Sequence, residues 1–177
     1  MKSLTLEKQA IIEKYTKKYK DYLSSWSLEK VQMEYISGLN RMHRSDAKYL
    51  NYFKHDIKVG DICYIDFGHA YTYEAGFQHF GIIMNIVGNK VFVVPMTSNK
   101  QTYKKADPRN AYPIKTLFQM GDVPGLHRQS VCFLHDAKFI NKARIINVKA
   151  HVAVESDLFK RLKQQLLSII TWSWNLV

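Results

Sequence analysis

The sequence has few cysteines and lacks the motifs of several common enzyme classes. Two of its 177 residues are cysteines, Cys63 and Cys132, and both lie in apolar, strand-like runs without the spacing of a zinc site. We therefore interpret them as small core residues. The chain also has no Walker-type glycine-rich loop, no Gly-x-Ser-x-Gly elbow and no metal-spaced set of His, Cys and Asp. We expect neither a metal nor another cofactor.

Long apolar runs are absent as well. No segment approaches the roughly 18 uninterrupted apolar residues that a membrane span needs. The first residues contain no apolar stretch of the signal-peptide type. These absences favour a protein of the reducing cytoplasm with no membrane span.

Acidic residues are fewer than basic ones, 15 Asp and Glu against 26 Lys and Arg, which gives a formal net charge of +11. A protein with this charge suits a polyanionic partner, because neutralising the phosphates of a nucleic acid releases its condensed counterions. Nucleic acid is the leading candidate partner. An anionic membrane surface or an acidic protein is the alternative.

The length and composition predict one folded domain with an appendage. Hydrophobic residues make up 46% of the chain and charged residues 23%, as in ordinary globular proteins. A chain of this length can bury a real core. The pattern of residues divides it into a helical N-terminal extension, 1–55, and a β-rich domain with a C-terminal helix, 56–177.

Two amphipathic helices are predicted in the extension. Apolar residues recur at steps of three and four from Thr5 to about Leu23, with Lys and Glu between them. A second helix starts at Ser27, a suitable N-cap, and runs toward Leu39. Ser45 or Asp46 is a candidate cap for a third short helix. The extension is either a helical hairpin packed on the domain or an arm that contacts RNA or a partner.

From Ile57 onward the sequence is typical of short β-strands. A polar and aromatic loop is expected at 68–76, a hairpin turn at 87–91 and a charged loop at 99–110. A C-terminal helix, capped by Ser156 or Asp157, is expected to run to about Ile170. The predicted strands are 61–67, 81–87, 91–97, 112–114, 130–135 and 144–148.

Three blocks of this β-rich region resemble the PemK/MazF toxin family. They are VGDICYIDF at 59–67, YEAGFQHFGIIM at 73–84 and VVPMTS at 93–98. Glu74 and Gly76 keep the family's Glu-x-Gly loop, and Thr97 with Ser98 keep its Thr-Ser corner. Later blocks, DVPGL at 122–126, SVCFLHDAK at 130–138 and KAR at 142–144, are similar to the family's following strand and its basic residues. The resemblance covers about 57–170.

The resemblance implies an α+β fold, an SH3-like (PemK/MazF-type) small β-barrel with a C-terminal helix, here preceded by the helical extension. Members are often homodimers and cut single-stranded RNA without metal. The stretch 81–98 also resembles ToxN-type toxins, which share the fold and pair with an RNA antitoxin. One departure concerns the site: His79 and Phe80 stand where the family has an Arg-Pro pair.

Metal-free RNA cleavage needs a base for the ribose 2'-hydroxyl, an acid for the departing 5'-oxygen and donors for the charged phosphorane. We expect His79 to act as general acid or base, with Thr97 and Ser98 as phosphate-binding hydroxyls. His135 is the candidate second proton-transfer group, oriented by Asp136. In the alternative reading these histidines only form structural hydrogen bonds.

Other residues are predicted to bind RNA. His69 and Tyr71 lie on the loop that covers the active site in relatives, where bases can stack on aromatic faces. Gln78 is a candidate for a base edge or a phosphate. The remaining candidates are lysines that follow the Thr-Ser corner or the later strand, where a solvated charged surface is the alternative reading: Lys100, Lys104, Lys105 and Lys138.

The sequence thus predicts a cytoplasmic, toxin-like endoribonuclease that leaves 2',3'-cyclic phosphate and 5'-hydroxyl ends. It would be restrained by a cognate antitoxin, protein or RNA. The alternatives are a catalytically inactive β-barrel that binds RNA or protein, because the Arg-Pro pair is missing, and an interaction protein that docks through its helices. Fold alone does not decide among them.

Overall fold

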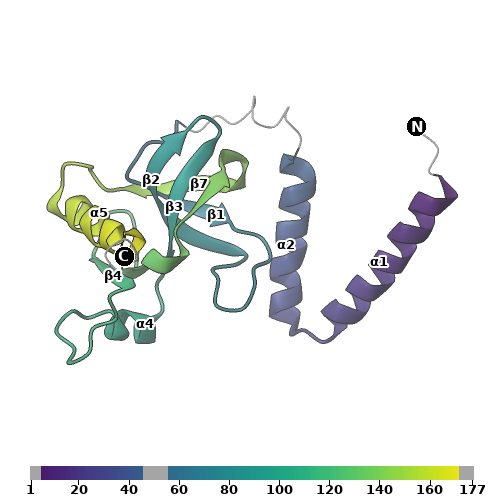
Figure 1. The fold of residues 1–177 in the computed structure, drawn as a ribbon, viewed down its shortest axis with the longest axis horizontal. Helices are drawn as coiled ribbons and strands as arrows, with labels where there is room; N and C mark the ends of the chain where they lie inside the picture. Colours follow the sequence, from purple (N-terminus) through teal and green to yellow (C-terminus); the bar gives the residue numbers. More distant parts are fainter. Residues whose placement is uncertain (1–4, 46–55, 172–177) are drawn as a thin grey trace.

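The computed structural model describes residues 5–45 and 56–171, which form a β-rich body with a helical hairpin at its side (Figure 1). The hairpin consists of α1 (Leu6–Ser24) and α2 (Leu28–Arg44). The strands of the body are β1 (Asp61–Asp66), β2 (Gln78–Val87), β3 (Lys90–Thr97), β4 (Leu117–Gly121), β5 (Ser130–Phe133), β6 (Lys138–Asn141) and β7 (Ile145–His151). Its helices are α4 (Lys100–Lys105), α5 (Asp157–Ile170) and the 3-10 turns η1 (Leu134–Asp136) and η2 (Lys142–Arg144).

The strands form a seven-stranded antiparallel sheet in the order β4-β5-β3-β2-β1-β7. β5 and β6 both pair with β3, β6 with its first half and β5 with its end. The tight turn between β2 and β3 is the one that the sequence predicts at 87–91. With α5 closing one side, the architecture confirms the predicted α+β fold.

Two apolar clusters fill the body, one on each face of the sheet. The cluster under α5 joins Ile82 and Val94 of the sheet to Leu162 and Leu166 of the helix. The stripe of leucines that predicts an amphipathic C-terminal helix therefore faces the core. The other cluster includes Ile65 and eight further residues. Cys63 and Cys132 are both buried and free, as expected of core residues.

The segment after β3 differs from the prediction. The charged loop expected at 99–110 begins with a short helix, α4, whose N-cap Asn99 accepts hydrogen bonds from the backbone N–H groups of Gln101 and Thr102. Ala106, at the C-terminal end of α4, packs on Leu117 in a small third cluster. The strand expected at 112–114 is a bend, and β4 forms at Leu117–Gly121 instead.

The two N-terminal helices lie where the sequence places them. Thr5 and Ser27 accept hydrogen bonds from backbone N–H groups three residues later, as N-caps do. α2 extends beyond the predicted end to Arg44, and the third predicted helix, near Phe53, lies outside the described residues. Tyr19 of α1 donates a hydrogen bond of 2.5 Å to the buried carboxylate of Glu34 on α2.

α2 is fixed to the end of β1 through one carboxylate. The buried Asp66 accepts hydrogen bonds from Ser37 at 2.6 Å and Asn40 at 2.8 Å, and from the backbone N–H of Gly68 at 3.0 Å. Arg44 adds a hydrogen bond to the carbonyl of Ile145. The helix is therefore held by charge-assisted hydrogen bonds.

Within residues 5–45 and 56–171, no helix has the length and apolarity to cross a membrane.

Candidate active site

A cavity of about 790 Å³ opens at the end of the barrel where the β1–β2 loop, α4 and η1 meet. Its size falls in the range of about 300–1,000 Å³ that is usual for ligand sites. Figure 1 shows the β1–β2 loop between α4 and α2. Three histidines line the cavity, His69, His79 and His135, together with Lys30, Lys105 and other residues of the loop and of α4.

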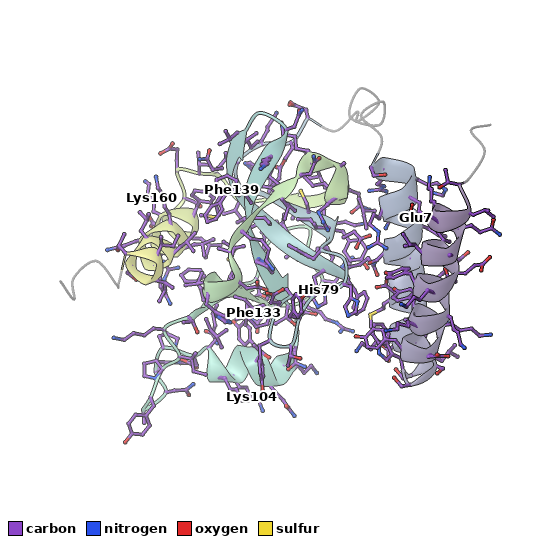
Figure 2. All side chains as sticks on the ribbon, turned by 45° about the vertical axis from the view of Figure 1, so that its right-hand side comes forward. Glu7, His79, Lys104, Phe133, Phe139 and Lys160 are labelled. Carbon is purple, nitrogen blue, oxygen red and sulfur yellow. The ribbon has the colours of Figure 1, made fainter. Side chains whose placement is uncertain are left out.

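His79 is at the start of β2, where strand pairing sets it opposite Ile65 of β1. Its side chain is half-buried, and its Nδ1 atom is buried without a hydrogen-bond partner among the described residues. Figure 2 shows His79 beside Phe133, at the barrel end that faces α4. An orphaned buried polar atom is uncommon in folded proteins. Because the side chain also lines the cavity, His79 is a candidate site residue.

His135 reaches the cavity from η1, directly after β5, and is exposed. The neighbouring Asp136 was predicted to orient it, but both oxygens of that carboxylate have other partners. One accepts the backbone N–H of Ala75 at 2.5 Å, and the other pairs with Lys138 at 2.7 Å. Asp136 therefore ties the β1–β2 loop to η1, which fixes the loop over the cavity.

His69 links the loop to the extension. Its ring lies 5.9 Å from that of Phe77 in a stacked arrangement and 5.1 Å, edge-on, from that of Trp26. Tyr22 of α1 also stacks with it, with the two ring centroids 6.0 Å apart. Phe77 has a φ of 55°, which is strained for a bulky residue and is tolerated where the surroundings hold it. The aromatic groups thus hold the loop against the hairpin.

Several predicted site residues lie outside the residues that line this cavity. Continuing the pairing of Phe80 with Met96 by one residue brings His79 opposite Thr97. The Thr97 hydroxyl accepts the backbone N–H of Asn99 at 3.2 Å. The other predicted residues beyond the lining are Ser98, Tyr71, Gln78, Lys100, Lys104 and Lys138.

Gln78 belongs to the junction with α2. Its amide nitrogen donates to the Ser37 hydroxyl at 2.7 Å and lies 3.4 Å from Asp66. The residue predicted to read RNA thus helps to hold the extension. Lys138 is adjacent to the cavity, because its ammonium group pairs with the lining residue Asp136.

The comparison with protein families decides the classification. Residues 58–170 match the family described as PemK-like, MazF-like toxin of type II toxin-antitoxin system. The chain belongs to this family. A comparison with curated proteins finds no significant match.

One solved MazF structure shares the fold of this PemK/MazF-like chain. MazF (Form-I) from Deinococcus radiodurans aligns with a TM-score of 0.50 and 15% identity over 66% of this chain and 98% of that one. MazE-MazF (Form-II) from the same organism aligns with a TM-score of 0.45 and 14% identity over 66% and 97%. An endoribonuclease from a mycobacterial species aligns with a TM-score of 0.44 and 12% identity over 66% and 92%.

In this PemK/MazF-like domain the family's Glu-x-Gly loop forms part of the cavity wall, through Glu74, Ala75 and Gly76. The matched residues begin at 58, so the extension lies outside the family domain. Lys30 nevertheless lines the same cavity. Sequence reasoning missed Lys30 because a helix pattern predicts an apolar face but does not tell which barrel residues that face will meet.

A second, smaller cavity of about 290 Å³ lies between α2 and the barrel and is rich in arginine, with Arg41, Arg44 and Arg144 among its lining residues. Arg144 donates to the carbonyls of Asp66 and Phe67, and Arg44 donates to a carbonyl of β7. The Arg44 bond joins the extension to the toxin domain, whereas the Arg144 bonds lie within the barrel. The larger cavity holds His79 and His135 and is therefore the candidate active site.

Proposed function

We propose that this PemK/MazF-like toxin is an endoribonuclease that cuts single-stranded RNA without a metal ion. The ribose 2'-oxygen attacks the adjacent phosphorus, the bond to the 5'-oxygen breaks, and the products carry a 2',3'-cyclic phosphate and a 5'-hydroxyl. One protein group removes the proton of the 2'-hydroxyl and another protonates the 5'-oxygen. The metal-free mechanism, the products and the residue roles are parts of this proposal.

The observation that carries the proposal is that His79 and His135 line one cavity together with Lys105. Imidazole exchanges protons near neutral pH, and an ammonium group stabilises the charge that develops on the phosphorane. Because Nδ1 of His79 is buried and unpaired among the described residues, Nε2 is the atom assigned to proton transfer. His135 supplies the second proton-transfer group.

The surroundings of the cavity suit a strand of RNA. Thr97 and Ser98, at the end of β3, are assigned to bind phosphate at the rim. The exposed Tyr71 offers a face for base stacking. His69 and Gln78, both predicted to bind RNA, are instead engaged in ring contacts and hydrogen bonds with the hairpin. Lys138 and the lysines of α4, Lys100 and Lys104, are assigned to phosphates of the strand beyond the cavity.

Membership of the family also suggests which proteins or RNAs bind this chain. As a member of a toxin-antitoxin family, the protein is proposed to be restrained by a cognate antitoxin, protein or RNA, and to form a homodimer. Growth arrest on expression, relieved by a gene encoded beside it, would support this assignment. A barrel that binds RNA without cutting it is the competing function, and the experiments below separate the two.

The first test concerns the chemistry. Purified protein is incubated with a long single-stranded transcript in excess EDTA, and product ends are analysed. We expect cleavage with 5'-hydroxyl ends, and no cleavage of DNA or of RNA with 2'-deoxyribose at a mapped cut site. A requirement for a divalent cation contradicts the mechanism. Binding without products over long incubation favours the inactive barrel.

The second test concerns His79. We expect His79→Ala to reduce the cleavage rate by about 10²-fold or more, because a positioned proton-transfer group contributes about that much. His127→Ala is the matched control, since His127 is exposed and outside the cavity lining. Unfolding midpoints of both variants show whether the fold is kept. A folded His79→Ala variant that cuts at the wild-type rate removes His79 from the mechanism.

A further inference from the structure

The wall of the candidate active site includes a residue that the family domain does not supply. Lys30, in the first turn of α2, lines the cavity that holds His79 and His135. The family match begins at residue 58. The extension therefore contributes a cation to the candidate site of a domain to which it does not belong.

Lys30 is held in a defined position. Its ammonium nitrogen lies 3.8 Å from the centroid of the Trp26 ring, a cation-π contact. Trp26 in turn packs edge-on against His69 and Phe77 of the β1–β2 loop. The indole thus supports the lysine at the cavity and joins it to the loop that carries His69.

The helix that carries Lys30 is fixed as well. Ser37 and Asn40, further along α2, are hydrogen-bonded to the buried carboxylate of Asp66. Such bonds hold the helix in one place relative to the barrel. The first turn of α2, which carries Lys30, therefore has a fixed position in the cavity wall.

The charges at the cavity suit a polyanion that runs through it. Lys30 comes from α2 and Lys105 from α4, two elements on either side of the β1–β2 loop (Figure 1). Of the acidic lining residues, Asp136 is paired with Lys138, whereas Glu74 lies on the exposed loop. Two lysines from different elements of one cavity wall can each neutralise a phosphate of a bound RNA strand.

We propose that Lys30 binds a backbone phosphate of the RNA substrate beside the scissile one, so that α2 forms part of the substrate-binding surface. The inference rests on the proposed function, because it assigns an additional substrate contact to the same site. Lys30 is a binding and positioning residue. The reacting protons remain with the histidines.

The test uses the full chain with Lys30→Gln, which removes the charge and keeps most of the side chain. Cleavage kinetics are measured on a transcript with mapped cut sites, and binding is measured across salt concentrations on the same RNA with 2'-deoxyribose at the scissile position. We expect KM to rise about 5- to 10-fold with kcat within about two-fold. The slope of log affinity against log salt should fall in magnitude by about one. Lys30→Arg should restore most of the affinity.

Lys17→Gln is the matched control, because Lys17 is an exposed lysine of α1 outside the cavity lining. If Lys30→Gln and Lys17→Gln behave alike while both still cut RNA, the contact is refuted and the proposed function stands. If Lys30→Gln cuts faster than wild type, α2 obstructs the site and the inference is wrong. A wild-type protein that neither binds nor cuts RNA refutes the proposed function itself.

Discussion

The nitrogen atoms of His79 have unequal environments. Nδ1 is buried without a partner among the described residues, while the side chain lines a cavity with His135. A buried polar atom without a hydrogen bond costs free energy, which packing elsewhere has to offset. Burial also fixes the ring by limiting its rotation. In the proposed mechanism the other nitrogen, Nε2, exchanges the proton with the substrate.

The two thiols illustrate how burial controls reactivity at the same scale. Burial, with a contribution from nearby Asp61, raises the pKa of Cys63 from 9.0 to about 12. Burial alone raises the pKa of Cys132. Since the thiolate is the reactive form, both side chains should be inert in the native protein.

We predict that a thiol reagent such as DTNB leaves native protein unmodified at pH 8 and labels two cysteines per chain in urea. Because the folded state holds the Cys63 proton to a higher pH than the unfolded chain does, the free energy of unfolding should fall as the pH rises from about 9 to 12. Labelling of either cysteine at the rate of a free thiol in the native protein would show that the core opens locally.

At the scale of the element, the junction between α2 and β1 depends on one carboxylate. Asp66 is buried and accepts hydrogen bonds from two residues of the helix, Ser37 and Asn40. Hydrogen bonds to a charged group contribute more than neutral ones, about 1.5–3 kcal/mol each.

We therefore predict that Asp66→Asn lowers the free energy of unfolding by about 2–3 kcal/mol, because the amide replaces one acceptor with a donor that faces other donors. The measurement is urea denaturation followed by circular dichroism. Asp56→Asn is the matched control: Asp56 is exposed and, among the described residues, pairs with the exposed Lys58, and a change within about 0.5 kcal/mol is expected. Equal effects of the two substitutions would mean that the junction contributes little to stability.

The helices with strong periodicity and most of the strands were predictable from the sequence, whereas α4, β4 and β6 were not. α1, α2 and α5 follow from apolar spacing and from their capping residues. α4 is short and charged, and it depends on packing of Ala106 against Leu117, which no local pattern reveals. The segment at 112–114 has an apolar composition, but Pro113 cannot donate a ladder hydrogen bond and the chain bends there.

The residues of the candidate site likewise divide into those that the sequence predicts and those that it does not. His79 and His135 were predicted because imidazole transfers protons near neutral pH and because both lie at strand ends within blocks that resemble family motifs. Lys30 was not identified, because its place on the cavity depends on the docking of α2 through Ser37 and Asn40. Long-range packing of this kind combines segments that are far apart in sequence.

At the scale of the whole molecule, the barrel and the extension differ in what holds them together. Among the described residues, the apolar clusters of the body draw on Ile57 and later residues and include no residue of α1 or α2. α1 buries no residue at all. The barrel therefore has the core it needs, whereas the hairpin relies on polar bonds and ring contacts.

We predict that a chain starting at Asp56 keeps the barrel fold and loses stability, because Asp66 loses the donors Ser37 and Asn40. It should also bind RNA more weakly, because Lys30 is gone. Circular dichroism, thermal unfolding and binding to a non-cleavable RNA measure the three effects, with the full chain as reference. Unchanged affinity would mean that the extension has no part in RNA binding. An unfolded fragment would contradict the conclusion that the barrel has a sufficient core without the hairpin.

The Asp66 junction also limits how the protein can be re-engineered. The acceptor belongs to the barrel, and two of its donors, Ser37 and Asn40, belong to a helix outside the matched family domain. If the hairpin were fused to another MazF-type barrel, it would not dock there unless that barrel had a carboxylate at the strand end that corresponds to Asp66. Replacing the hairpin here would remove the donors Ser37 and Asn40 from the Asp66 carboxylate. The hairpin and the barrel therefore have to be transferred or replaced together.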